Sequence, residues 1–504
     1  MKTKILLLSV VSILILGLAG GAYWWLSRPQ VITFSDGSKL TLLGVDYGKR
    51  HAVPGGKLPL GSPRIVRTAG PQVVPGPPNG NGSFTTLNDT LVVWMRAKYD
   101  YTTNQPGQPS QYRSFQLSVY DKNGTACAFA SSRNVSDSPQ GDDILAMPFD
   151  AFPRREGKLY LRAQEDGSGG RKISDKKFVI SNPAAKMSFA KWTPEPVPDR
   201  QTNGDWAMTL TKLVAGVNMP YQTNSANPDD ARNKGVQVTF HAERAGKRVA
   251  NWQLASVEIT DATGNRTGIN SWPKGVGQVQ WNGDEGTFTY PYGLWPDEPA
   301  WKLRLIMAQT SDFSSDEQWT AQNIPVVPGG QQILNAISGF RDFSVRDGVG
   351  MDNNLPSAPT PCAETDLGGH HIKVFPAVQF TNNARFGNLP ANFTPPQTAL
   401  SIQIQPALME NGMIFRNGAN GTQKADDGLR LTLAKVTDGQ GGEIQTYYSG
   451  FNMNGTGGTN FTSTHRFMLR NLAGVTNISA TIALYKNRVF EFTVKPEKAA
   501  TAKP

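Results

Sequence analysis

One short segment, residues 362–371, concentrates side chains that could bind a metal ion. It reads Cys362-Ala-Glu364-Thr-Asp366-Leu-Gly-Gly-His370-His371. Thiolate, carboxylate and imidazole are suitable zinc ligands, but their spacing here matches no zinc-ribbon or helical pattern. Adjacent residues of a strand point to opposite faces, so His370 and His371 are poorly placed to bind one ion. We therefore expect a polar loop leading into a strand, and we predict no metal and no cofactor.

A group of tryptophans is the second chemical feature. Six of them occur between positions 252 and 319: Trp252, Trp272, Trp281, Trp295, Trp301 and Trp319. Of these, Trp272, Trp281 and Trp295 lie among glycines and prolines, which favours loops, and we name them as candidate ligand contacts. A row of exposed indoles can stack on the flat faces of sugars. Packing inside a hydrophobic core is the competing interpretation.

Recognisable catalytic motifs are missing from the sequence. It contains no Gly-x-Ser-x-Gly elbow, His-Glu-x-x-His pair, phosphate loop or dinucleotide fingerprint. We therefore expect no enzymatic activity. A carbohydrate-active hydrolase with its site near the tryptophans is the alternative, because the paired carboxylates of glycosidases carry no local signature.

The N-terminal segment favours a membrane anchor. Lys2 and Lys4 precede an uncharged run at positions 5–26, and a helix of that length covers the ~30 Å hydrocarbon core. Three aromatic residues at its end suit the membrane–water interface: Tyr23, Trp24 and Trp25. We expect a single-pass signal anchor with a cytoplasmic N-terminus and an extracytoplasmic remainder. The alternative is a secreted protein whose signal peptide is cleaved near the small residues at 19–22.

Charge and cysteine content set further bounds. The formal net charge is +10, but the basic residues form no dense stripe, so we expect no nucleic-acid partner. The two cysteines, Cys127 and Cys362, are too few for a disulfide scaffold. They could pair in an oxidising compartment, but they lie in different predicted domains. We expect two separate buried thiols.

Beyond residue 30 the sequence is rich in alternating apolar strands broken by Gly, Pro, Asn and Asp, and the strands recur in the same order three times. Residues 177–181, 324–327 and 490–494 are the predicted last strands of the three copies. Asp121-Lys-Asn-Gly and Asp261-Ala-Thr-Gly give the first two copies the same strand-to-turn junction. In the third copy Asp438 comes later, and the register there is less secure.

The predicted fold class is mainly β, with an N-terminal transmembrane or signal-anchor helix followed by three tandem β-sandwich domains. Sandwiches of immunoglobulin or fibronectin-III character bury the apolar faces of such strands against each other. The predicted boundaries are 1–30 for the cytoplasmic stub and anchor, 31–183 for copy 1, 184–204 for a Pro-rich linker, 205–330 for copy 2, 331–367 for a second linker, 368–496 for copy 3 and 497–504 for a disordered tail.

This organisation predicts a binding, adhesion or scaffolding component of the cell envelope. Its expected partners are the membrane and either an envelope polysaccharide or another envelope protein. The alternative is a carbohydrate-binding or hydrolytic envelope protein with its site in copy 2.

Overall fold

The computed structural model describes most of the chain after residue 29. The described ranges are 30–34, 37–53, 73–74, 83–98, 114–131, 133–136, 142–167, 170–218, 234–250, 252–267, 279–291, 293–309, 311–329, 331–338, 357–380, 398–408, 429–454, 462–470, 472 and 474–499. The predicted anchor, with Tyr23, Trp24 and Trp25, lies outside these ranges, as does Trp272. Within them no helix has the length and apolar character needed to cross a bilayer.

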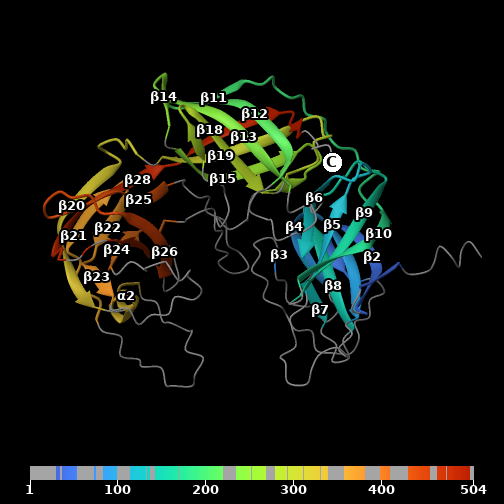
Figure 1. Ribbon diagram of the computed structural model, residues 1–504, viewed down its shortest axis with the longest axis horizontal. Coiled ribbons are helices and arrows are strands. Elements are labelled where there is room, and N and C mark those ends of the chain that lie inside the picture. The colour runs from blue at the N-terminus through green and yellow to red at the C-terminus, as the bar shows by residue number, and fades with distance from the viewer. Residues whose placement is uncertain are drawn as a thin grey trace, which may run out of the picture.

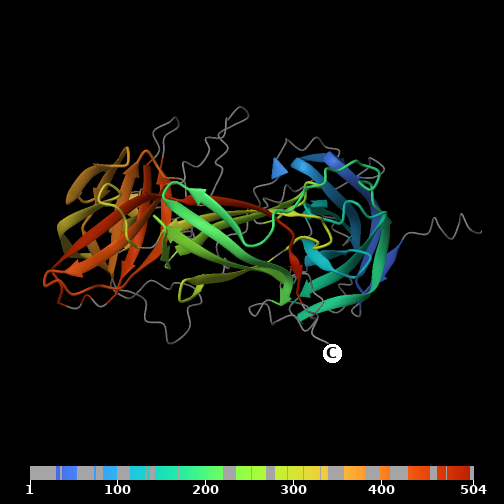
Figure 2. The ribbon, with the colours of Figure 1, turned by 90° about the horizontal axis from the view of Figure 1, so that it is seen from above.

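The described chain is mainly β and forms three lobes in an arch, with the second lobe at the top (Figure 1). Each lobe pairs two layers of strands around a core, which is the sandwich-like architecture that the strand pattern predicts. In Figure 2 the first and third lobes lie at opposite ends of the long axis.

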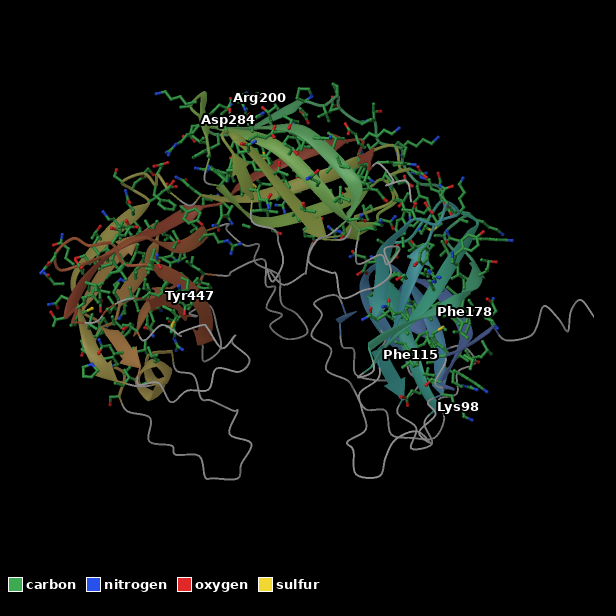
Figure 3. The ribbon with its side chains drawn as sticks, in the orientation of Figure 1. Lys98, Phe115, Phe178, Arg200, Asp284 and Tyr447 are labelled. Atoms are coloured by element: carbon green, nitrogen blue, oxygen red, sulfur yellow. The ribbon has the colours of Figure 1, made fainter. Side chains whose placement is uncertain are left out.

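The first sandwich contains two separate sheets. One has the order β1-β2-β4-β8-β7, with β3 beside β4, and the other has the order β10-β9-β5-β6. The bounds are β1 (Val31–Thr33), β2 (Lys39–Ala52), β3 (Val73–Val74), β4 (Ser83–Lys98), β5 (Ser114–Tyr120), β6 (Ala126–Ser131), β7 (Arg133–Ser136), β8 (Asp142–Phe149), β9 (Lys158–Gly167) and β10 (Gly170–Ser181). Phe115 on β5 and Phe178 on β10 are buried in its core (Figure 3).

The second sandwich repeats this strand order. One sheet runs β11-β12-β13-β18-β17, with β14 beside β13 and β30 beside β12, and the other runs β16-β15-β19-β29. The bounds are β11 (Asp199–Asn203), β12 (Trp206–Asn218), β13 (Lys234–Arg244), β14 (Lys247–Val249), β15 (Trp252–Asp261), β16 (Arg266–Thr267), β17 (Gln280–Asn282), β18 (Glu285–Pro291), β19 (Trp301–Gln309), β29 (Arg488–Val494) and β30 (Glu497–Lys498). Val236, Val238 and Phe240 alternate into the core as predicted.

In the third sandwich the two layers are joined into one nine-stranded sheet. Its path is β21-β22-β24-β23-β20-β28-β25, and β27 pairs with both β24 and β26. The bounds are β20 (Gln318–Gly329), β21 (Ala363–Leu367), β22 (His370–Val374), β23 (Ala377–Phe380), β24 (Thr398–Gln405), β25 (Leu429–Asp438), β26 (Thr446–Asn454), β27 (Thr462–Leu469) and β28 (Asn477–Lys486). The short helix α2 (Gln331–Ser338) packs Leu334 and Ile337 against Phe375 and Met468.

The second and third sandwiches exchange their last strands. By its order in the sequence β20 closes copy 2, yet it pairs with β28 and puts Ala321 and Ile324 into the third core. Strand β29 closes copy 3 in the sequence, yet it pairs with β19 and puts Phe490 and Phe492 into the core of the second sandwich. The sequence assignment of residues 324–327 and 490–494 is therefore wrong.

The exchange has a simple geometric cause at β28. Only Asn487 separates the end of β28 from the start of β29. The tightest common hairpins need two turn residues, so β29 cannot fold back onto β28 and instead continues into the neighbouring sandwich. The vacant edge of β28 is filled by β20.

Two predicted boundaries also change. The interval 331–367, predicted to be a linker, contains α2 and β21. The tail begins with ordered chain, because β30 pairs in parallel with Val214 and Ala215 of β12 and the amide of Ala499 donates to the Ala215 carbonyl. The Pro-rich interval 184–204 does connect the first two sandwiches, although its last residues form β11.

Candidate functional site

One turn geometry recurs in all three sandwiches, after β5, β15 and β25. In each an aspartate side chain accepts hydrogen bonds from the backbone amides two and four residues later. In each the glycine three residues later has positive φ, between 80° and 90°. The turns are Asp121–Thr125, Asp261–Asn265 and Asp438–Gly442. The third turn thus has the same register as the other two, which the sequence left insecure.

The second of these turns is buried against the first sandwich. The side chain of Asn265 accepts a hydrogen bond from the Phe152 amide at 3.1 Å and donates one to the Phe152 carbonyl at 2.9 Å. The Arg154 guanidinium donates to Asn265 Oδ1 at 2.9 Å and to the Thr263 carbonyl at 3.2 Å. Arg154 is 4% exposed, and its burial lowers the pKa of its guanidinium.

The first turn makes the reciprocal contact with the second sandwich. Trp295 follows β18, as Phe152 follows β8, and its indole donates to the Thr125 carbonyl at 3.1 Å. The Asn123 amide donates to Asp297 at 3.0 Å. Beside them Arg155 pairs with Glu298 at 3.1 Å. The turn of the first sandwich therefore contacts the β18–β19 connection of the second, and the turn of the second contacts the β8–β9 connection of the first. The two contacts are related by approximate two-fold symmetry.

The carboxyl groups of this interface are desolvated. Burial is the largest cause of the raised pKa values of Glu298, Glu156 and Asp121. For Glu298 the Arg155 guanidinium opposes this shift without cancelling it. Burial in this interface thus disfavours the charged form of these three carboxyl groups.

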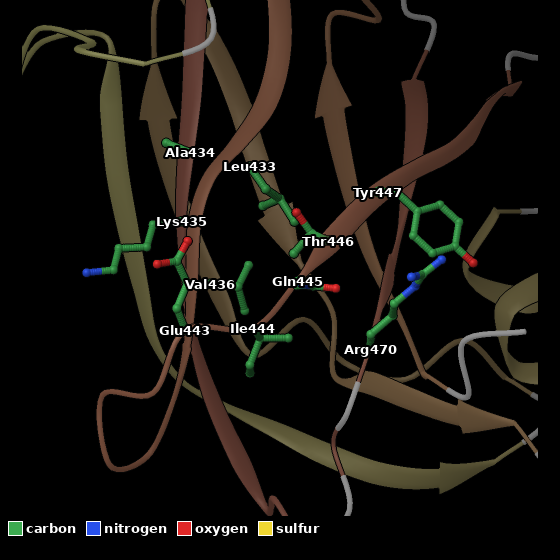
Figure 4. Close-up of a pocket in the computed structure, with 10 residues that line it drawn as sticks. All are labelled: Leu433, Ala434, Lys435, Val436, Glu443, Ile444, Gln445, Thr446, Tyr447 and Arg470. Atoms are coloured by element: carbon green, nitrogen blue, oxygen red, sulfur yellow. The ribbon is translucent and has the colours of Figure 1, made fainter. Parts of the chain in front are cut away.

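The third turn has a different environment, because residues 439–443 are all exposed. Beside it β25 and β26 diverge into different layers and leave a pocket of about 450 Å³ (Figure 4). The pocket is lined by Leu433, Ala434, Lys435, Val436, Glu443, Ile444, Gln445, Thr446, Tyr447 and Arg470.

Apolar, aromatic, polar and charged side chains all contribute to the lining of this pocket. The Arg470 guanidinium lies 5.3 Å from the ring centre of Tyr447, a cation–π distance. Partial burial raises the pKa of the Tyr447 hydroxyl, so it is a neutral donor at pH 7. Lys435 and Glu443 add one charge of each sign. Such a site suits a ligand that supplies an apolar group and hydrogen-bonding groups together.

The predicted tryptophan platform is not assembled by the described residues. Trp295 is only 3% exposed, because it lies in the contact between the first two sandwiches. Trp281 is partly buried, packs edge-on against Phe240 and donates to the Trp252 carbonyl at 3.2 Å. Trp295 therefore presents no exposed face on which a sugar could stack, whereas Trp272 lies outside the described residues.

The 362–371 segment behaves as a strand hairpin. His370 is buried and bonds to the Pro406 carbonyl, whereas His371 is partly exposed between Glu364 and Asp366, so the two imidazoles do face opposite ways. No group of three or more metal-ligand side chains gathers anywhere in the described part of the chain. Cys362 is a free cysteine on an exposed residue, which corrects the expectation that it is buried, and its partly buried Sγ donates to the Val374 carbonyl at 3.3 Å. The side chain of Cys127 lies outside the description.

The sequence patterns did not predict a buried polar network in the first sandwich. His51 Nδ1 lies 2.5 Å from Asp46 Oδ1, and its Nε2 lies 3.2 Å from the Thr86 hydroxyl. The Trp94 indole donates to the second Asp46 oxygen at 3.2 Å. The Thr86 hydroxyl already donates to the Asn88 carbonyl at 2.8 Å. We therefore assign the network of Asp46, His51, Thr86 and Trp94 a structural role in joining β2 to β4, and we call it the clasp.

Comparison of the chain with models of protein families gave no match, and comparison with curated proteins gave none.

Proposed function

We propose that the protein is a single-pass, envelope-anchored component whose three immunoglobulin- or fibronectin-III-like sandwiches form a binding or scaffolding structure outside the cytoplasm. The observation that carries this proposal is the interlocking of the sandwiches. The first two bury Asn265, Trp295 and Arg154 between them, and the second and third exchange strands. A component that holds partners at a set spacing needs this kind of rigidity, since domain motion is the default across small interfaces.

The third sandwich is the proposed binding domain. It carries the exposed member of the repeated turns and the pocket beside Tyr447, and its lobe lies at the end of the arch opposite the first sandwich (Figures 1 and 3). The alternative, a carbohydrate site in copy 2, has less support, because Trp295 is buried and the indole of Trp281 is bonded internally.

Cys362 offers a test of location. A membrane-impermeant maleimide added to intact cells should label wild-type protein, because Cys362 is exposed and free. Burial raises the pKa of its thiol, so labelling at pH 8 should be faster than at pH 7. Both proteins carry Cys127→Ser so that only Cys362 can react, and adding Cys362→Ser is the control that should lose the label. Labelling only after cell lysis would contradict an extracytoplasmic location.

Binding itself is tested with the full-length protein in detergent micelles against isolated envelope polysaccharides and envelope proteins. We expect saturable binding to one of these classes. N-terminal sequencing of the mature protein tests the anchor, and a start near residue 23 would show that the segment is cleaved.

A further inference from the structure

The chain enters the first sandwich through a fixed contact between Gln30 and β10, the end strand of its sheet. The Gln30 side chain donates from Nε2 to the Val179 carbonyl at 2.9 Å and accepts at Oε1 from the Val179 amide at 3.0 Å. The side-chain amide thus pairs with both backbone groups of Val179, as a neighbouring strand would. Position 30 of the chain is therefore held at the edge of β10.

This contact lies close to the end of the proposed membrane segment. Only four residue steps separate Leu26, the last residue of the uncharged run, from Gln30. An extended chain advances about 3.5 Å per step, so the two residues are at most about 14 Å apart. If positions 5–26 span the bilayer, the edge of β10 at Val179 lies next to the lipid headgroups.

Two exposed valines flank the contact. Val31 follows Gln30 and is 40% exposed, and Val179 is 41% exposed. Among the described residues only three other large apolar side chains are comparably exposed: Met187, Val197 and Tyr448. Apolar side chains on a surface that meets a bilayer are stabilised by entering its interfacial layer. The two valines are therefore placed as a membrane-facing edge requires.

The outer face of β9 and β10 beside this edge is basic. Three cross-strand pairs make up this face: Arg162 with Lys177, Tyr160 with Val179, and Lys158 with Ser181. The residues that alternate with them, such as Phe178, are buried in the core, so the three pairs point outward. Lys158 and Lys177 are exposed, and Arg162 is partly exposed. We call this surface the basic face.

The charges on the basic face repel one another. Arg162 and Lys177 are directly opposite, and like charges in that position destabilise a sheet. The Arg162 Nε donates to the Ser174 carbonyl at 2.9 Å, and Lys177 Nζ lies 5.1 Å from the ring centre of Tyr120, so both cations are held on the face. Among the side chains of β5, β9 and β10 that the structure describes, none is a carboxylate. Residues 158–181 as a whole contain six basic and three acidic residues.

We propose that the basic face binds anionic lipid headgroups of the membrane in which the chain is anchored. Lys158, Arg162 and Lys177 contact headgroup phosphates, and Val31 and Val179 enter the layer between headgroups and acyl chains. A phosphate between Arg162 and Lys177 removes the repulsion within that pair. An acidic polysaccharide would match the charge but would not account for the exposed valines beside Gln30. The inference rests on the proposed anchor and extends it, because it assigns the first sandwich its own contact with lipid.

The test uses the full-length protein in lipid nanodiscs, made either of phosphatidylcholine alone or with about one third phosphatidylglycerol. Acetylation by acetic anhydride, which is uncharged, is followed at each lysine by mass spectrometry. We expect Lys158 and Lys177 to react about threefold or more slowly in the anionic discs, and this difference to shrink in about 0.5 M salt. Lys247, exposed in the second sandwich, is the internal control and should react equally in both discs.

A double variant tests which charges are responsible. Arg162→Gln with Lys177→Gln should leave Lys158 equally reactive in the two kinds of disc. The matched control is Lys186→Gln with Lys191→Gln, which removes the same charge from exposed linker positions and should keep the protection of Lys158.

Three outcomes would overturn the inference. They are equal acetylation of the basic face in both discs, protection of Lys158 that survives Arg162→Gln with Lys177→Gln, and protection by a soluble acidic polysaccharide that anionic lipid does not give. The comparison on the wild type decides the question even if the double variant does not fold. Co-purification of the protein with neutral discs reports the anchor alone, so a failure of the proposed anchor is distinguishable from a failure of this contact.

Discussion

The side-chain amide of Asn265 pairs with both backbone groups of Phe152, at 3.1 Å and 2.9 Å, as a neighbouring strand would. It thereby joins the turn after β15 to the connection between β8 and β9. All these groups are buried, so the bonds compete with no water. This one residue satisfies a backbone amide, a backbone carbonyl and part of the Arg154 guanidinium across the contact between two sandwiches.

We expect Asn265→Ala to destabilise the contact between the first two sandwiches by about 2–3 kcal/mol, because it leaves buried donors and acceptors without partners. Urea denaturation of the purified protein measures this loss. The matched control is Asn123→Ala in the first turn, whose amide bonds to Asp297 on the surface. It should cost under about 0.5 kcal/mol. Equal losses in the two variants would contradict the interface as described.

The strand exchange predicts where two core truncations act. Phe492→Ala should destabilise the second sandwich, and Ile324→Ala the third, by about 3–5 and 2–5 kcal/mol respectively. Both side chains are at most 1% exposed. Hydrogen exchange resolves the location: protection should fall in β15 and β19 for Phe492→Ala, and in β25 and β28 for Ile324→Ala. The opposite pattern would support a simple tandem arrangement without exchange.

Glu298 gives the interface a pH dependence. Its pKa is raised on folding, mainly by burial, so the folded state binds more protons than the unfolded state. Its favourable contribution is full below the unfolded pKa and is lost as pH rises through the folded pKa. The unfolding free energy of wild type minus that of Glu298→Gln should therefore decrease as the pH rises from 4 to 7. Urea titrations across that range measure the difference, and a rise with pH would refute the stated sign.

The Asp46–His51 pair should behave as a buried clasp. Asp46→Asn weakens the bond to the fully buried His51 side chain, and we expect a loss of about 2 kcal/mol. Asp284→Asn is the control, because Asp284 lies 4.0 Å from His241 on the surface. It should change stability by less than about 0.5 kcal/mol. Thermal unfolding compares the two, and indistinguishable melting temperatures would contradict the clasp.

Local patterns in the sequence were enough to predict the mainly β character and much of the repeat. Alternation such as Val236, Val238 and Phe240 has a period of two, which is set by the backbone of the strand itself. The Asp-type turns are equally local, since their bonds span four residues. The third turn could have been found by the spacing of Asp438 and Gly441, which matches Asp121 and Gly124.

Contacts between residues far apart in the chain required the tertiary structure. Trp295 and Asn265 carry no local sign that they meet the first sandwich, because turn and partner lie more than 100 residues apart. The residues of β20 and β29 do not indicate which of the vacant sheet edges each strand will pair with. Sequence alone therefore determined the strands, their faces and their turns, which depend on neighbouring residues. The exchange of last strands and the burial of Trp295 were decided only in three dimensions, where each edge pairs with whichever strand can reach it.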